Sequence, residues 1–210
     1  ETISHSLTAT FDNKNVGSNK AVTVNSISLA DGTNGGLAAN YSLSTGQTTT
    51  ANITPKTLTA TAASTNKTYD GLKTATTTLT LSGFIGTETV TSTNSSTFNN
   101  KNVGTGKTVT VNSITLADGT NGGLAANYSI STGQTTTADI TAKSLTVSGI
   151  TASNKTYDAT TTATLNTGSV TYTGLVSGDV FNGTYTGAFS DKNVGTGKTV
   201  TITPSYTGAD

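Results

Sequence analysis

The chain has 210 residues, with 11 basic and 11 acidic residues and a formal net charge of zero. Every basic residue is lysine, so the arginine-bearing basic face that usually neutralises phosphates is missing, and nucleic-acid binding is disfavoured. Cys, Met and Trp are absent, which excludes disulfides, thiolate metal sites and cysteine nucleophiles. No apolar run approaches the roughly 20 residues that span a bilayer, so we predict no membrane insertion.

One phrase recurs three times along the chain. It reads FDNKNVGSNK from Phe11, FNNKNVGTGK from Phe98 and FSDKNVGTGK from Phe189. A second phrase, NKTYD, begins at Asn66 and again at Asn154. These spacings indicate tandem copies of a unit of about 88 residues. The predicted boundaries are the C-terminal part of one repeat (1–55), a complete repeat (56–142) and the N-terminal part of a third repeat (143–210).

Apolar and polar residues alternate in short runs, which is typical of half-buried strands. Threonine fills many of the polar positions and suits the exposed face of a sheet. The Gly- and Asn-rich segments between the runs predict tight turns in which Gly or Asn takes a positive φ. GLAAN, at 36–40 and 123–127, is the one helical hint and is too short for a stable helix. The runs lie, in chain order, at 22–24, 58–60, 79–81, 109–111, 145–147, 170–172 and 200–202.

This spacing predicts an all-β fold with about six to eight short strands in each repeat. We expect tandem small antiparallel β-sandwich units of Ig-like architecture. Two alternatives remain: a β-grasp-like unit in which GLAAN seeds a short helix, and a β-solenoid, whose rungs are usually much shorter than this period. The low content of Leu, Ile, Val and Phe predicts a thin core.

Aromatic residues that return once in each repeat are predicted to be core residues. In the Tyr-Asp pairs, we expect Tyr69 and Tyr157 to pack inside while Asp70 and Asp158 shape turns. The recurring aromatic residues are Phe11, Phe98, Phe189, Tyr41 and Tyr128.

Three tyrosines, Tyr172, Tyr185 and Tyr206, have no counterpart in the other copies. Exposed aromatic rings on one sheet face are typical of sites that bind ligands such as sugars. We therefore predict these three residues as the ligand-binding candidates of the chain.

Other motifs favour structural interpretations. Asp31, Asn34, Asp118 and Asn121 offer calcium oxygen ligands, but each ADGTN loop has a single carboxylate, so we predict turns and no cofactor. VGTGK lacks the spacing and the following helix of a phosphate-binding loop, which predicts a hairpin turn. The single histidine, His5, has no triad partner pattern. These observations predict that the chain is not an enzyme.

The lysines raise the hypothesis of side-chain cross-links. An amide bond between Lys and Asn or Asp requires a neutral amine and a protonated acid, both of which burial can provide. The lysines concerned are Lys67, Lys155 and those of the pairs Lys14-Asn15, Lys101-Asn102 and Lys192-Asn193.

The order of the phrases KTYDG or KTYDA, SGDV, FNNKNVGTGKTVTV, TGAD and NYSISTGQTTTADIT resembles the YDG-type repeats, relatives of the MBG-type repeats. Such repeats stand in tandem in very large bacterial surface proteins of the filamentous-haemagglutinin-like class. The likeness covers essentially the whole chain, although Ala159 stands where Gly is expected and SLADGTNGGLAANY is longer than expected. The resemblance implies a secreted cell-surface adhesin, exported by a partner outer-membrane channel, without catalysis.

The leading interpretation is therefore a non-enzymatic stalk or adhesive segment that supports surface or cell–cell attachment and biofilm formation. Its partners would be an unknown receptor, glycan or exopolysaccharide, together with homotypic contacts. One alternative is a carbohydrate-binding module. Another is binding to ice or an ordered surface through Thr48–Thr50 and Thr135–Thr137, although consecutive strand residues point to opposite faces.

Overall fold

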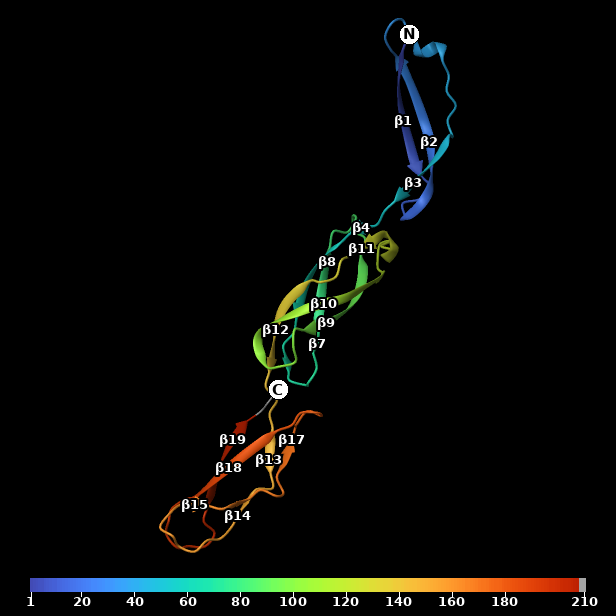
Figure 1. Cartoon of the computed structure of the whole chain (residues 1–210). Helices are drawn as coiled ribbons and strands as arrows, with labels where there is room; N and C mark the ends of the chain where they lie inside the picture. The colour runs from blue at the N-terminus through green and yellow to red at the C-terminus, as the bar shows by residue number, and fades with distance from the viewer. Residues whose placement is uncertain (208–210) are drawn as a thin grey trace. The chain divides into compact units, whose positions relative to one another are not determined.

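A computed structural model describes residues 1–207 and is all-β, as predicted (Figure 1). Short strands form several small, mainly antiparallel sheets, which confirms the expectation of tandem small β-sandwich repeats. Residues 208–210, the GAD of the TGAD phrase, lie outside the described part. The chain divides into two compact units, Glu1–Ala62 with Leu79–Asn94 and Asn112–Gln134, and Ala63–Thr78 with Ser95–Val111 and Thr135–Asp210.

The first unit contains an antiparallel three-stranded sheet in the order β1-β2-β3 (Figure 1). β1 is Ile3–Phe11, β2 is Gly17–Asp31 and β3 is Thr48–Ile53. A second, very short pair joins β4 (Lys56–Thr57) and β11 (Tyr128–Ser129) in parallel. This parallel pair joins two segments of the second repeat that are far apart in the sequence.

The largest sheet has the order β6-β12-β10-β9-β7. β12 pairs antiparallel with β10 and parallel with β6, so it lies between the two. This position makes β12 the closing strand of the second repeat. The bounds are β6 Lys67–Thr68, β7 Thr74–Ala75, β9 Val90–Phe98, β10 Gly104–Asp118 and β12 Thr135–Thr141.

Strand pairs also build the rest of the second repeat and the third repeat. β5 (Thr59–Ser64) lies beside β8 (Thr77–Ser82). In the third repeat β13 pairs with β17 and β14 with β16, while β15, β18 and β19 form an antiparallel sheet. Their bounds are β13 Thr146–Ser148, β14 Thr151–Ala152, β15 Thr162–Ala163, β16 Leu165–Asn166, β17 Thr171–Thr173, β18 Asn182–Phe189 and β19 Val200–Thr207.

The ADGTNGG and STGQ segments form loops as predicted, but the hairpin turns predicted at 16–20 and 103–107 are wrong. Residues 17–20 and 104–107 begin β2 and β10, where a shift in pairing register accommodates the extra Gly and Asn residues. Asn19, Asn34 and Asn121 take positive φ values of 53°, 55° and 56°, which Asn tolerates better than most residues. GLAAN forms only a three-residue 3-10 helix in each copy, η1 (Ala38–Asn40) and η2 (Ala125–Asn127). Within residues 1–207, no helix has the length and apolar character to cross a membrane.

The second repeat has nine strands rather than the predicted six to eight. The difference comes from β4, β6, β7 and β11, which are only two residues long. Pairs this short carry too little alternation to be recognised in a sequence, because two residues do not define a period.

Two small buried clusters form the core of the second repeat. In the second unit, Phe98, Val109, Ala138 and Ile140 pack together, and we name this group the Phe98 cluster. In the first unit, Leu58, Val90 and Tyr128 form the Tyr128 cluster. Both groups are small, as the composition predicted. Partly buried residues pack around them: Tyr69 and Ala75 against the Phe98 cluster, and Leu81, Phe84, Leu116 and Ile130 against the Tyr128 cluster.

The predicted burial of the recurring aromatic residues is wrong for the first repeat, and Phe189 of the third repeat is only half-buried. Phe98 is 2% exposed, whereas Phe11 is 38% exposed and Tyr41 is also exposed. Phe98 is covered by the segment from Lys67 to Ala75, and residues 1–55 contain no counterpart of that segment. Burial of these rings therefore depends on neighbouring segments as well as on their place in the repeat.

Tyr157 also departs from its predicted core position, since it is 58% exposed. Its counterpart Tyr69 packs against the Phe98 cluster, and its backbone N–H donates to the Thr141 carbonyl of β12 at 2.8 Å. The described part of the third repeat contains no counterpart of β12, so Tyr157 lacks the strand that holds Tyr69.

Candidate functional site

The three tyrosines predicted as ligand-binding residues come together in the third repeat. Tyr172 lies on β17, Tyr185 on β18 and Tyr206 on β19. The Tyr185 hydroxyl donates to the Tyr172 hydroxyl at 3.0 Å. Phe181 joins the group, with its ring centre 5.0 Å from that of Tyr172 and 5.1 Å from that of Tyr206. We call these four residues the aromatic cluster.

Strand pairing explains this grouping. Tyr206 lies directly opposite Gly183 across the β18–β19 pair, and Tyr185 follows two residues later on the same face. An added Cβ at Gly183 would lie 2.6 Å from the Tyr185 hydroxyl oxygen and 3.1 Å from that of Tyr172. Glycine at this position therefore leaves the space in which the two hydroxyls meet.

The tyrosine rings of the aromatic cluster differ in their exposure to solvent. The hydrogen bond to Tyr172, followed by burial, raises the pKa of Tyr185 to about 12, so Tyr185 stays neutral and serves as a hydrogen-bond donor. Tyr172 and Tyr185 are half-buried, whereas Tyr206 is 53% exposed. Tyr206 is thus the ring with the most surface available to a ligand.

Phe181 was missed in the sequence interpretation, and its place in the repeat was the available signal. Phe181 follows Asp179 by two residues, as Val90 follows Glu88, and Tyr172 of VTYTG matches Leu81 of LTLSG. Val90 belongs to the Tyr128 cluster and Leu81 packs against it. Phe181 and Tyr172 of the aromatic cluster therefore occupy positions that build the core in the second repeat.

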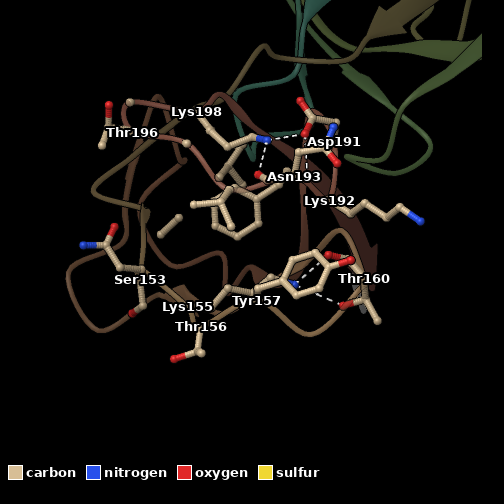
Figure 2. A pocket seen from close by; sticks show the side chains of 17 residues that line it. Ser153, Lys155, Thr156, Tyr157, Thr160, Asp191, Lys192, Asn193, Thr196 and Lys198 are labelled. Atoms are coloured by element: carbon tan, nitrogen blue, oxygen red, sulfur yellow. Dashed lines mark hydrogen bonds and ion pairs between the residues drawn. The ribbon is translucent and has the colours of Figure 1, made fainter.

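A groove of about 590 Å³ opens elsewhere in the third repeat (Figure 2). Two loops line it, at 153–160 and 191–198, together with Phe189 and Val200. No sequence pattern indicated this groove.

Two of the three lysines that line the groove, Lys155 and Lys198, bind to their own loops. Lys155 Nζ donates to Asp158 Oδ1 and to the Thr160 carbonyl, each at 2.8 Å, and lies 5.6 Å from the Phe189 ring centre. Lys198 Nζ pairs with the Asp191 carboxylate and donates to the Asn193 carbonyl at 2.7 Å (Figure 2). Lys155 and Lys198 therefore hold their loops in place.

The same region of the second repeat is filled. Lys67 lies 5.5 Å from the Phe98 ring centre, matching Lys155 over Phe189. There, β12 passes alongside and buries Ala138 and Ile140 against Phe98. The groove thus corresponds to the position that a closing strand like β12 takes in the second repeat.

The Tyr-Asp pairs form turns, as predicted for their aspartates. Asp70 Oδ1 accepts from the Leu72 N–H at 2.9 Å and from Lys67 Nζ at 2.7 Å. Asp158 Oδ1 accepts from the Thr160 N–H at 2.9 Å in the same way. Each carboxylate thus closes its turn and pairs with the lysine three residues before it.

Acid should weaken the third repeat through Asp158. The hydrogen bond from Lys155, followed by those from Thr160, lowers the pKa of Asp158 to about 2. A lowered carboxyl pKa contributes stability above the unfolded value, about 3.9 for Asp, and that stability is lost as pH falls towards the folded value. We expect the melting temperature, followed by circular dichroism, to fall between about pH 4 and pH 2. Asp158→Asn should melt lower at neutral pH and lose less on acidification, and parallel curves for the two proteins would contradict this assignment.

Ala159 occupies a backbone conformation that favours glycine. Its φ is 63°, close to the 78° of Gly71 at the same place in the second repeat. A Cβ is unfavourable there, so Ala159→Gly should raise the free energy of unfolding by about 0.5–1 kcal/mol. Ala152→Gly, in strand β14, is the matched control and should lower it by a similar amount. Urea denaturation gives the free energy of unfolding of both variants. A loss of stability in Ala159→Gly would show that the backbone at Ala159 is not strained.

The ADGTN loops use their aspartates internally. Asp31 Oδ1 accepts from the Ala38 N–H and Asp118 Oδ1 from the Ala125 N–H, both at 2.7 Å. These bonds anchor η1 and η2 to the preceding strands. Across the described residues, no group of three or more His, Asp or Glu side chains is placed to hold a metal ion.

Four lysines of the cross-link hypothesis, Lys14, Lys67, Lys101 and Lys155, lie in ion pairs. Lys67 pairs with Asp70 at 2.7 Å, and the bond from Lys67 followed by that from Leu72 lowers the pKa of Asp70. Lys14 pairs with Glu88, and Lys101 lies 3.6 Å from Asp179. A lowered carboxyl pKa favours the charged acid, whereas the cross-linking chemistry needs the protonated one.

The two threonine runs differ in exposure, because Thr48–Thr50 of β3 are all exposed whereas the run in β12 alternates. In β12, Thr135 and Thr137 are exposed while Thr136 is half-buried. This is the expected behaviour of consecutive strand residues, so the run presents only part of its hydroxyls on one face.

Comparison with known proteins identifies a family. A family model described as the YDG domain matches residues 1–51, 54–138 and 141–210. The matches leave out only residues 52–53 and 139–140. No curated protein and no solved structure shows a match to the chain.

Proposed function

Because the chain belongs to the YDG domain family and carries its domain in tandem, we propose that it is a non-enzymatic stalk and adhesive segment of a secreted bacterial surface adhesin. It would be exported through a partner outer-membrane channel. Its tandem repeats would support attachment to surfaces or to other cells, including in biofilms.

The observation that carries this proposal is the near-identity of the copied unit. Residues 98–142 repeat residues 11–55 with few changes, and stacked repeats gain length from unit and neighbour interactions. Copying a module multiplies equivalent surfaces and reach, whereas a catalytic pocket needs only one copy. The ion pairs that hold the turns also favour a structural use of the charged residues.

The aromatic cluster favours a second candidate, direct binding of a carbohydrate. Tyr206 offers a half-exposed ring beside Phe181, with the Tyr172 and Tyr185 hydroxyls close by. Apolar rings with a few placed polar groups are typical of ligand sites. On this proposal the third repeat binds a glycan or an exopolysaccharide.

Beads coated with the full chain would separate the possibilities. We would score bead clustering and retention on glycan and exopolysaccharide arrays, with and without calcium, for the wild type, Tyr206→Ala and Tyr41→Ala. Tyr41 is a matched control because it is exposed to a similar extent in the first repeat.

Each outcome has a distinct meaning. Glycan retention lost only in Tyr206→Ala supports carbohydrate binding, and clustering without added glycan supports homotypic adhesion. The absence of both from a folded chain would contradict the adhesive role and leave a spacer.

A further inference from the structure

The loop after the first strand of the recurring hairpin contacts the following repeat. In the first unit, Lys14 of FDNKNV forms an ion pair with Glu88 of the second repeat. Glu88 Oε2 also accepts from the Tyr128 hydroxyl at 2.8 Å. The Glu88 side chain is only 12% exposed, although that of Lys14 is 66% exposed. The loop thus places a surface lysine on a well-covered carboxylate.

Two hydrogen bonds with the Asn127 side-chain amide fix the same loop beside the ion pair. The Val16 backbone N–H donates to Asn127 Oδ1 at 2.8 Å. Asn127 Nδ2 in turn donates to Asn15 Oδ1 at 3.0 Å. Asn127 and Tyr128 are neighbours in the NYS phrase, so this one phrase supplies the amide partner and the hydroxyl that binds Glu88. A contact with both charge and amide partners sets orientation more closely than a lone surface ion pair.

The second unit contains a related contact between the second and third repeats. Lys101 holds the place of Lys14 in the recurring phrase, and it lies 3.6 Å from Asp179, which holds the place of Glu88. Nearby, an added Cβ at Gly71 would lie 2.9 Å from Val176 Cγ1. The glycine of the YDG turn therefore allows the loop of the next repeat to come close.

The remaining copies carry the lysine phrase or a carboxylate at the matching position. The third repeat has Lys192, Asn193 and Val194 in the phrase, and the Val194 side chain is strongly exposed. The first repeat has Glu1 at the place of Glu88, with the Tyr41 hydroxyl 3.5 Å from Glu1 Oε2. Each repeat thus carries a lysine loop and a carboxylate at separate places.

We propose that the Lys-Asn-Val loop of each repeat is a docking element for the next YDG repeat, which receives the lysine on its Glu or Asp and the loop backbone on the Asn of its Asn-Tyr phrase. The partner of this surface is another repeat of the same kind. The contact orients neighbouring repeats and limits bending at the junction.

Spin labels across the first junction test this proposal in the full chain. The chain has no cysteine, so Ser6→Cys and Thr93→Cys, both at exposed positions of the first unit, provide two unique labelling sites. Pulsed electron paramagnetic resonance then measures the distribution of distances between the two spin labels. We expect a narrow distribution in the wild-type background, a broader one in Lys14→Glu, and a return towards the narrow one in Lys14→Glu with Glu88→Lys.

The controls keep the result decisive. Lys192→Glu makes the same charge change in the third repeat and should leave the distribution unchanged. Lys14 lies on an exposed loop, so the melting temperature of Lys14→Glu should stay near that of the wild type. An unchanged distribution in Lys14→Glu, or equal broadening in Lys192→Glu, would overturn the proposal. Glu88→Lys removes the acceptor of the Tyr128 hydroxyl and could unfold the chain. In that case the distance distributions of Lys14→Glu and Lys192→Glu still test the proposal.

Discussion

Replacing Phe98 by alanine should lower the free energy of unfolding by about 3–5 kcal/mol, the usual cost of emptying a buried aromatic site. The Phe98 ring packs among Val109, Ala138 and Ile140 and is 2% exposed. The core of this repeat is small, so neighbouring side chains have little freedom to refill the space. Urea denaturation followed by circular dichroism measures the loss.

Phe11→Ala is the matched control for this variant, since Phe11 holds the same place in the preceding copy. Its ring is already 38% exposed, so the substitution removes less buried surface and should cost under about 1 kcal/mol. Equal losses in the two variants would show that the two phenylalanines are buried alike and would contradict the structure.

Gly123→Ala should also destabilise the second repeat strongly, by about 3 kcal/mol or more. An added Cβ would lie 1.9 Å from the Thr89 carbonyl oxygen and 2.8 Å from its carbon. Both are backbone atoms. The Gly119 N–H also donates to the Gly123 carbonyl at 2.9 Å, which ties the two ends of the loop together. The ADGTNGG loop must therefore move as a whole to admit the methyl group.

Gly168→Ala provides the control for Gly123→Ala, because no atom lies within 4 Å of its added Cβ and its φ is not in the left-handed region. It should be neutral or slightly stabilising, by up to about 1 kcal/mol, because alanine has fewer unfolded conformations. Thermal melting of the two variants side by side is sufficient, and a tolerated Gly123→Ala would mean that the loop does not lie against Thr89.

Several features of the site depended on local chemistry and were predictable. Asp70 and Asp158 shape their turns because a short carboxylate reaches the N–H two residues ahead. Asn19 and Asn121 take positive φ for a similarly local reason. The grouping of Tyr172, Tyr185 and Tyr206 was not derivable, since it requires the pairing of β18 with β19 and the space above Gly183.

The sequence by itself determined the repeat, the all-β class, many of the turns and the thin core, because periodicity, turn residues and composition act over a few neighbouring positions. Only the tertiary structure decided which copies of a recurring residue are buried. Phe98 and Phe11 share one phrase, yet β12 and the Lys67–Ala75 segment cover Phe98. Among residues 1–207, no counterpart of that segment lies beside Phe11. The contact of Lys14 with Glu88, 74 positions apart, likewise depends on how one repeat folds onto the next, which no local pattern encodes.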